Sequence, residues 1–263
     1  MASAQGLFGR KRLQVRSAAM TDVGRVREAN EDSYYVSDEL GLFVVADGMG
    51  GHVGGQMASN LAVETISAGV GKAQETLREA PIPDDLEQSE VPKLLADAVR
   101  EACAAIYDAG QEDLELQGMG TTVTTMLLLH SHAFLAHVGD SRAYLQRKDR
   151  IIQITDDHSL INEQIKLGLI TAEAARTSRL KNVITRSVGY ERDVAVDTFG
   201  LPIEAGDKFL LCSDGLTNFV DDTEIGLALA TLELAEVPER MVNLANERGG
   251  DDNITVVCLE VTD

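Results

Sequence analysis

The alternation of apolar and polar positions predicts a chain of many short strands with a few helices between them. Two β-type runs are separated by the polar residues DELG, which is a plausible hairpin. Apolar residues recur at helical spacing over 54–70, which predicts a first helix there. A loop rich in proline and acidic residues follows over 80–92. A second helix is expected over about 93–109. The expected hairpin strands are Asp32–Ser37 and Leu42–Ala46.

Further strands follow in the second half of the chain. Their connections are too short for helical crossovers, so we expect consecutive strands to pair antiparallel. The expected strands are Thr121–Leu129, Ala133–Val138, Ser141–Arg147, Ile151–Ile154, Phe209–Cys212 and Ile254–Val261, with helices near Asp222–Leu229 and Val237–Glu247. Runs of strands mixed with paired helices favour an α+β fold, in which helices cover antiparallel sheets, over a doubly wound parallel fold.

The segment 157–189, which we call the flap, differs from the rest of the chain. It holds a short helix at about Ser159–Leu167, a stop at Gly168 and a second short helix from Thr171. The run TSRLKNVITRS then adds basic character to an acidic protein. The pattern indicates either a lid that contacts substrate or an ordinary surface insertion.

Length and composition place the sequence among globular proteins. The chain has 263 residues, of which 44% are hydrophobic and 25% charged, enough for one domain with a substantial core. Its longest apolar runs fall far short of a membrane span. The first residues lack the apolar core of a secretion signal. We therefore predict a basic N-terminal arm over 1–12 and a single domain over 13–263.

The charge and the cysteines narrow the possible partners and the compartment. There are 23 basic and 43 acidic residues, a net charge of −20, which disfavours nucleic acid as a partner. Such a charge suits the binding of divalent cations, although many proteins are acidic for solubility alone. Cys103, Cys212 and Cys258 are widely spaced, which is typical of buried free thiols in the cytoplasm.

The glycine-rich stretch LFVVADGMGGHVGG, residues 42–55, could be a nucleotide loop or a scaffold for its aspartate. The P-loop pattern fails because Gln56 and Met57 follow where lysine and serine or threonine are needed. The stretch FVVADGM has an echo in LLCSDGL at 210–216, so Asp47 and Asp214 share one setting. A carboxylate followed by a free glycine carbonyl offers two oxygen ligands suited to Mg²⁺ or Mn²⁺. A single Asp-Gly would be an ordinary turn.

Three further acidic groups lie next to expected strands. They are Asp251 and Asp252 in GGDDNITV, Glu31 and Asp32 in VREANEDSY, and Asp140 in HVGDSRAY, where a hairpin turn is also a sufficient explanation. The sequence has no GxSxG motif that would compete with them. The chemistry consistent with all of them is a two-metal hydrolase, with Arg27 binding phosphate oxygens through its planar fork of donors.

In this order the motifs resemble the metal-dependent type 2C (PPM) family of serine/threonine protein phosphatases, particularly its compact bacterial members. The resemblance covers roughly Val15 to Val261. The motifs are RxxNED at 27–32, VVADGMGGHxxG at 44–55, GMGTT at 118–122, VGDSRAY at 138–144, TRSVG at 185–189, CSDGL at 212–216 and GGDDNIT at 249–255.

The resemblance implies a sandwich of two antiparallel sheets flanked by helix pairs, in four αββα layers with a flap insertion. It also implies two Mn²⁺ or Mg²⁺ ions, with a third possible. The implied metal ligands are Asp47, the carbonyl of Gly48, Asp214, Asp252 and, at the third site, Asp140. Glu31 and Asp32 would orient metal-bound waters, and Arg27 matches the phosphate-binding arginine of the family.

The implied activity is hydrolysis of phosphoserine and phosphothreonine in proteins through a water that bridges the metals. The expected protein is a cytoplasmic monomer, without a membrane span, that opposes a Ser/Thr kinase. The alternatives are a catalytically silent sensor of the same fold and a hydrolase of small phosphate esters. Departures from the family pattern stand at Met49, at Thr177 and Ser178 in the flap, and at Asn218.

Overall fold

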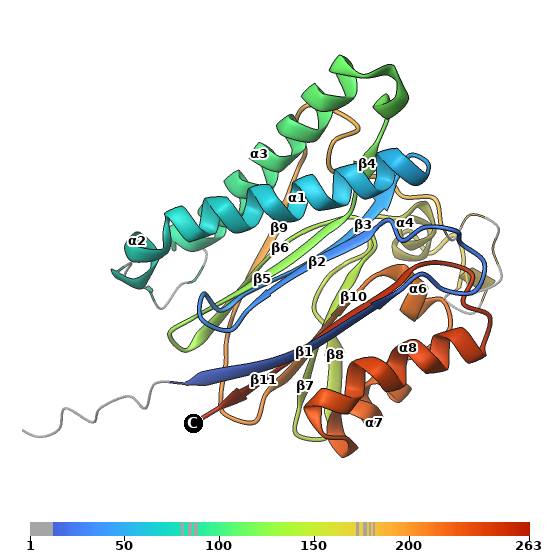
Figure 1. Ribbon diagram of the computed structural model, residues 1–263. Coiled ribbons are helices and arrows are strands. Elements are labelled where there is room, and N and C mark those ends of the chain that lie inside the picture. Colours follow the sequence, from blue (N-terminus) through green and yellow to red (C-terminus); the bar gives the residue numbers. More distant parts are fainter. Residues whose placement is uncertain are drawn as a thin grey trace, which may run out of the picture.

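The computed structural model describes residues 13–79, 82–83, 86, 89–171, 174–175, 178, 180 and 182–263, with the backbone alone at His52. The predicted basic arm over 1–12 and the flap position Thr177 lie outside the described residues. The architecture consists of two antiparallel sheets packed face to face, with helices on both outer faces (Figure 1).

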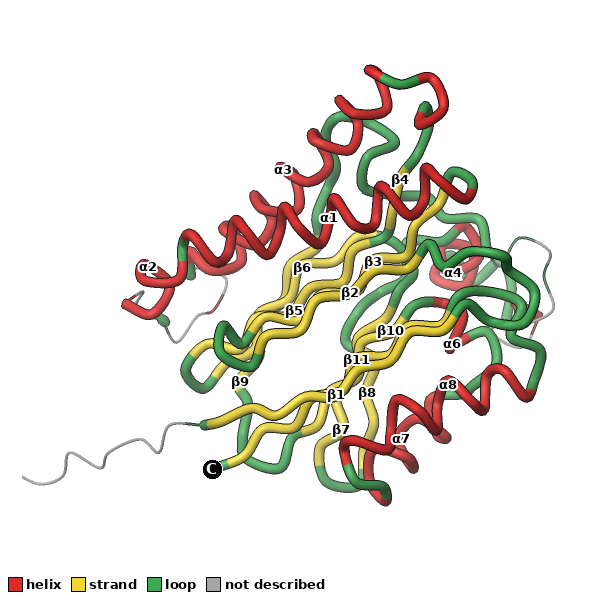
Figure 2. The backbone as a smooth tube through the Cα atoms, viewed as in Figure 1, coloured by secondary structure: helices red, strands yellow, loops and turns green. Residues whose placement is uncertain are grey.

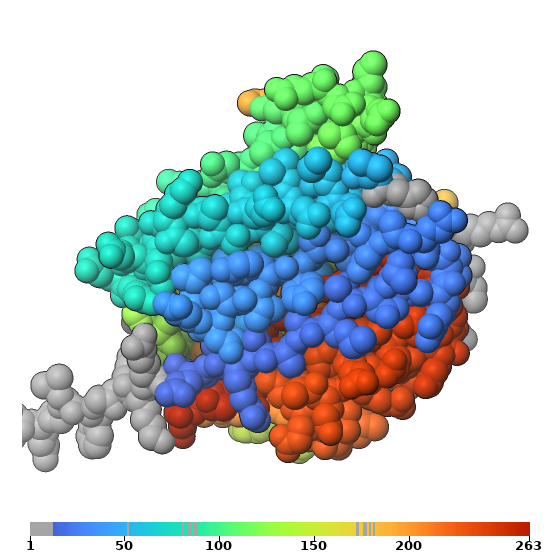
Figure 3. Space-filling view, viewed as in Figure 1, coloured from blue at the N-terminus to red at the C-terminus, as the bar shows by residue number. Residues whose placement is uncertain are grey.

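The first sheet joins the two ends of the described chain. Its strand order is β1-β11-β10-β7-β8, and every neighbouring pair is antiparallel. The strands are β1 (Gln14–Asp22), β11 (Ile254–Thr262), β10 (Lys208–Cys212), β7 (Arg142–Arg147) and β8 (Arg150–Gln153). Segments from the two ends of the sequence, blue and red, accordingly form adjoining parts of one face (Figure 3).

The second sheet has the order β2-β3-β5-β6-β9, again antiparallel throughout, and the short β4 pairs with β3. Its strands are β2 (Asp32–Ser37), β3 (Leu42–Met49), β4 (Gly120–Thr121), β5 (Val123–Leu129), β6 (His132–Val138) and β9 (Asp197–Pro202).

Two long helices cover the second sheet, and a pair of shorter ones covers the first (Figure 2). Within the described residues, none of these helices has an apolar stretch long enough to traverse a bilayer. The long helices are α1 (His52–Lys72) and α3 (Glu90–Glu112), and the shorter pair is α7 (Asp222–Thr231) and α8 (Val237–Glu247). Smaller elements are α2 (Gln74–Glu79), α4 (Leu160–Lys166), α6 (Asp214–Thr217), η2 (Leu114–Leu116) and η3 (Leu234–Glu236).

The strand β3 shows why the sheets are buried on both faces. Leu42, Val44 and Ala46 pack in the cluster under α1 and α3, whereas Phe43 and Val45 pack between the two sheets. Because successive side chains point to opposite faces, a continuous apolar run supplies two layers at once. A third cluster lies between the first sheet and the helices α7 and α8. The α+β sandwich in four αββα layers is confirmed.

Most elements predicted from the sequence are present, and the differences have physical causes. The β2–β3 hairpin and the antiparallel pairs β5–β6 and β7–β8 are confirmed. Helix α3 begins at Glu90 rather than about 93, since Ser89 caps it and proline is tolerated in the first turn. The sequence analysis missed β1, a half-exposed edge strand that mixes polar and apolar residues, as well as β9, α2 and α6.

One expectation about consecutive strands was wrong. β6 and β7 do not pair, because β6 lies in the second sheet and β7 in the first. The residues between them, Gly139–Ser141, cross from one sheet to the other, so Asp140 does not lie in a hairpin turn. Gly139 has a φ of +112°, a conformation that glycine adopts readily.

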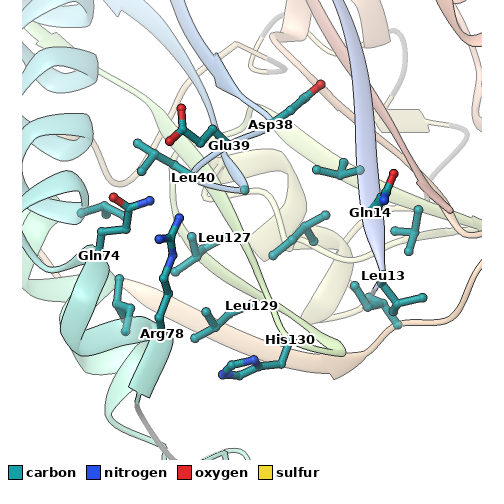
Figure 4. Close-up of a pocket in the computed structure, with 17 residues that line it drawn as sticks. Leu13, Gln14, Asp38, Glu39, Leu40, Gln74, Arg78, Leu127, Leu129 and His130 are labelled. Atoms are coloured by element: carbon teal, nitrogen blue, oxygen red, sulfur yellow. The ribbon is translucent and has the colours of Figure 1, made fainter. Parts of the chain in front are cut away.

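The two ends of the sandwich differ in chemistry. At one end the registers pair Asp32 with Asp47 and Asp22 with Ile254, so the predicted acidic residues meet there. The other end has a cavity of about 700 Å³, lined mainly by apolar side chains such as Leu40, Leu127 and Leu129 (Figure 4). The fold therefore gathers the candidate chemistry at a single end.

Candidate active site

The predicted site residues converge on a pocket of about 350 Å³, which we call the acidic pocket. Seven of the eight line it directly, and Asp32, 7% exposed, is the one that does not. The lining consists of Arg27, Glu31, Asp47, Gly48, Met49, Gly50, Gly51, Thr122, Asp140, Asn182, Ile184, Asp214, Asp252 and Asn253.

Two threonines of the GMGTT motif hold the backbone of Asp47. The Asp47 N–H donates to Thr122 Oγ1 at 3.0 Å, and its carbonyl accepts from the Thr122 N–H at 2.8 Å. The hydroxyl of Thr121 donates to the same carbonyl at 2.9 Å. The sequence analysis quoted this motif but assigned it no role. It fixes the position of the Asp47 backbone.

The glycine after Asp47 is needed for close packing rather than for a bend. The expected strand Leu42–Ala46 was too short, because β3 continues through Met49 and Asp47 lies within the strand rather than in a turn after it. A Cβ on Gly48 would lie 2.1 Å from the carbonyl oxygen of Gly55. The chain bends later, at Gly50 and Gly51, whose φ angles are +123° and +84°.

Asp214 begins the short helix α6 at the end of β10. A Cβ on the following Gly215 would lie 1.9 Å from the carbonyl oxygen of Asn253, so this turn packs directly against the GGDDNIT motif. The amide of Asn218 donates to Asp214 Oδ2 at 3.1 Å. Asn218, one of the departures from the family pattern, therefore supports the side chain of Asp214.

Asn253 ties the loop before β2 to the acidic pair before β11. Its Oδ1 accepts from the Glu31 N–H at 2.8 Å, and its Nδ2 donates to the carbonyls of Val23 and Ala29 at 2.9 and 3.0 Å. This side chain holds the loop that carries Arg27 against Asp252. The sequence offered a signal, because Asn253 follows the predicted ligand directly, but its role was missed.

Arg27 and Asp252 form an ion pair at the wall of the pocket. Arg27 Nη2 donates to Asp252 Oδ2 at 2.7 Å, and the two side chains are 45% and 23% exposed. The guanidinium has further N–H donors beyond this bond. Asp252, rather than the exposed Asp251, is thus the carboxylate that lies in the pocket.

Asp32 lies behind the pocket between hydroxyl groups of the first sheet. Its Oδ2 accepts from Ser213 at 2.8 Å and from Thr255 at 2.7 Å. Its Oδ1 is buried and has no hydrogen-bond partner among the described residues. A buried acceptor without a donor costs free energy, unless a water or an ion contacts it.

Asp140 reaches the pocket from the crossing between the sheets. It is 9% exposed and lies beside Ser141, whose hydroxyl is 2.7 Å from that of Thr122. The hydroxyl of Thr124 donates to the Ser141 carbonyl at 3.1 Å. The same group of threonines therefore positions both Asp47 and Asp140.

Burial and mutual repulsion dominate the electrostatics of these carboxyl groups. Burial raises the pKa of Asp47 well above its ordinary value of 3.8, and the charges of Asp32, Asp214, Asp140 and Asp252 raise it further. Burial likewise raises the pKa of Asp32 to about 7 and that of Asp140 to about 8.

Divalent cations fit this set of donors. Among the described lining residues Arg27 is the one cation, and it lies in the same pocket as the carboxylates of Glu31, Asp47, Asp140, Asp214 and Asp252. In the described part of the chain, no three His, Cys, Asp or Glu side chains are gathered as ligands of a single ion. The donors are instead spread along the pocket and include the Gly48 backbone. This arrangement suits hard cations that share oxygen ligands.

The flap contributes Asn182 and Ile184 to the wall of the pocket. Its two ends are joined, since the Leu160 N–H donates to the Val183 carbonyl and the Thr185 N–H to the His158 carbonyl, both at 2.8 Å. The flap therefore borders the pocket through the basic KNVITR run. The sequence marked the segment but not these two residues.

Comparison with known proteins agrees with this geometry. The sequence model described as Protein phosphatase 2C matches residues 25–255. The chain therefore belongs to the protein phosphatase 2C family and is a protein phosphatase.

Named relatives of the chain are bacterial. The serine/threonine phosphatase stp of Listeria innocua is 38% identical over 244 residues, which cover 91% of this chain and 93% of that protein. The serine/threonine protein phosphatase PstP of Mycobacterium tuberculosis is 37% identical over 97% of this chain, which matches 47% of that longer protein.

Solved structures are also similar. The crystal structure of the M. tuberculosis phosphatase PstP/Ppp has a TM-score of 0.84 and 36% identity, and covers 95% of this chain and 100% of that one. A structure of the PstP catalytic domain in complex with 2 manganese ions has a TM-score of 0.82 and 37% identity, with the same coverage.

Replacing Gly215 by alanine should disrupt the site. The added Cβ would meet a backbone carbonyl at 1.9 Å, so Asp214 and Asn253 must separate. We expect Gly215→Ala to lower the free energy of unfolding by about 1–3 kcal/mol, as overpacking does, and to weaken Mn²⁺ binding. Urea denaturation and calorimetry measure the two effects. Gly71→Ala in α1, where nothing lies within 4 Å, is the matched control and should be neutral or stabilising. Equal behaviour of both variants would contradict the packing argument.

The stabilisation by Mn²⁺ should grow as the pH rises. In metal-free protein, folded Asp32 and Asp140 hold their protons up to about pH 7 and about pH 8, whereas unfolded carboxyls lose theirs near 3.8. The folded state thus binds more protons in this window, and its stability falls as the pH rises. A bound cation relieves that loss, so the difference in Tm between Mn²⁺ and EDTA should increase from about pH 5 to about pH 8. A constant or decreasing difference would contradict the assignment.

Proposed function

We propose that this phosphatase hydrolyses phosphoserine and phosphothreonine in proteins with the help of two divalent cations, Mn²⁺ or Mg²⁺. The observation that carries the proposal is the convergence of Asp47, Asp214, Asp252 and Arg27 on one pocket. The names of the relatives and the manganese complex of PstP support the substrate class and the metal.

In this proposal Asp47, Asp214, Asp252 and the carbonyl of Gly48 hold the two cations, and Asp140 would serve a third and weaker site. When bound, the ions would supply an activated water and polarise the phosphoryl oxygens. Threonine, serine and asparagine contacts hold the carboxylates in place beforehand, so little reorganisation is needed on binding. Glu31, 6% exposed in the pocket lining, and Asp32, behind it, would orient metal-bound water.

Arg27 would bind the phosphate. Its guanidinium lies at the pocket wall beside Asp252, and its remaining N–H donors can form charge-assisted hydrogen bonds to phosphate oxygens. Met49, which also lines the pocket, has no proton to transfer. The proton of the leaving serine or threonine must therefore come from water or another group.

The surroundings of the pocket favour a protein substrate over a small ester. Val26 and Val183 are next to lining residues in the chain and are 64% and 41% exposed, and Val53, two positions after Gly51, is 67% exposed. Exposed apolar side chains around a polar pocket are typical of a surface that contacts another protein. The silent-sensor alternative is disfavoured because every proposed ligand residue is present in the sequence.

The partners and the setting follow from this activity. We expect a bacterial Ser/Thr kinase to supply the phosphoproteins. A monomer is expected, since one chain provides all the residues of the pocket. A cytoplasmic location is supported by Cys103, Cys212 and Cys258, which are free and buried.

Removing a metal-binding carboxylate should abolish hydrolysis. We expect the wild-type chain to cleave p-nitrophenyl phosphate with Mn²⁺ and to lose this activity in EDTA. Asp47→Asn, Asp214→Asn and Asp252→Asn should each lower kcat/KM by about 100-fold or more, the size of effect seen when one electrostatic stabiliser is lost. Asp251→Asn, an exposed neighbour, is the control and should keep activity within about threefold of wild type. Metal-independent turnover, or full activity in the three variants, would contradict the proposal.

A further inference from the structure

A second cavity adjoins the acidic pocket. It measures about 580 Å³ and lies between the flap helix α4 and the segment of α6 and the start of α7, and we call it the flap groove. Asp140 and Asp214 line both cavities, so the two lie side by side at these residues. A peptide with its phosphate in the acidic pocket can therefore extend a neighbouring side chain into the flap groove.

The groove has apolar walls on two sides. Ile161 and Ile165 contribute from α4, and Phe219 and Val220 contribute from the turn between α6 and α7. These walls can cover a hydrocarbon stem of several methylene groups.

The charges of the groove are unbalanced. Arg142 is the one basic residue in its described lining, and Asp157 already neutralises it through contacts of 2.6 to 3.0 Å. Asp221 and Asp222 are exposed at the start of α7, with no basic residue facing them in this lining. The groove thus combines apolar walls with an acidic rim.

Asp140, which the groove shares with the acidic pocket, adds a buried charge. Its carboxylate is nine-tenths buried, lines the groove, and has no ion pair or side-chain hydrogen bond among the described residues. A buried carboxylate without an ion pair at the inner end of the groove favours a positive charge beside it, which a cation on the pocket side or a basic side chain on the groove side would supply.

We propose that the flap groove binds a lysine or arginine side chain of the phosphoprotein substrate, close to the phosphorylated residue. The apolar walls would cover the stem, and Asp221 and Asp222 would attract the charged head. The inference rests on the proposed phosphatase activity and adds the substrate class that the enzyme selects. Because an extended chain advances about 3.5 Å per residue and the two cavities adjoin, the basic residue lies near the phosphorylated residue in sequence.

The test uses phosphothreonine peptides that differ at one position, which carries Lys, Ala or Glu. The position is moved over about four residues on each side of the phosphate. With wild-type chain and Mn²⁺, we expect one or more positions at which kcat/KM for Lys exceeds that for Glu about tenfold at low salt, and less at high salt.

Two variants report on the groove itself. Asp221→Asn with Asp222→Asn removes the charges but keeps the cap of α7 and the acceptor for the Tyr144 hydroxyl. In this double variant, the ratio of kcat/KM for the Lys peptide to kcat/KM for the Glu peptide should fall towards one. Thr223→Lys adds a positive charge at an exposed lining position and should favour the Glu peptide.

The matched control makes the same change in net charge elsewhere. The control is the double variant Glu101→Gln, Glu112→Gln. Both residues are exposed on α3, which packs on the second sheet. In this control variant, the ratio of kcat/KM for the Lys and Glu peptides should match that of the wild type. A wild-type ratio near one at every position, or equal shifts in the control and the groove variants, would overturn the proposal for the groove. Failure of the wild type to hydrolyse even p-nitrophenyl phosphate would instead contradict the phosphatase activity on which it rests.

Discussion

The rest of the site depends on the burial of several aspartates at one end of a β-sandwich. Asp32 and Asp47 are direct cross-strand neighbours, and like charges so placed repel each other. Their raised pKa values express this repulsion and the loss of hydration. The fold tolerates it because apolar clusters on both sides of each sheet hold the strands in place. A pair of cations would convert the same repulsion into binding energy.

Small and polar side chains set the geometry around those aspartates. Gly48 and Gly215 allow backbones to approach so closely that a Cβ could not fit. Asn253 and Thr122 then fix the neighbouring backbones by hydrogen bonds. Such a frame keeps the ligands in one arrangement before any ion or substrate binds. It also gives a structural role to residues of the sequence motifs that are not proposed metal ligands, such as Thr122 in GMGTT and Asn253 in GGDDNIT.

Much of the fold and most of the candidate site could be predicted from the sequence. Apolar runs predicted the interior strands, and the two similar Asp-Gly stretches indicated Asp47 and Asp214. Edge strand β1 was missed because its pattern is mixed, and the β6–β7 connection was misread because a short link can also change sheets. The hydrogen bonds of Asn253 and Thr122 span many residues, and local patterns carry no record of such contacts. The same limit hid the flap groove, whose walls come from separate parts of the chain.

The central claim is that the carboxylates of the acidic pocket form a site for two divalent cations. The most direct measurement is a calorimetric titration of the metal-free chain with Mn²⁺, checked by counting bound ions after dialysis. The account predicts two ions per chain, and fewer in the Asp47→Asn variant, since Asp47 lines the pocket and the charges of four other aspartates act on it. Binding of less than one ion per wild-type chain, or an unchanged number in the variant, would contradict it.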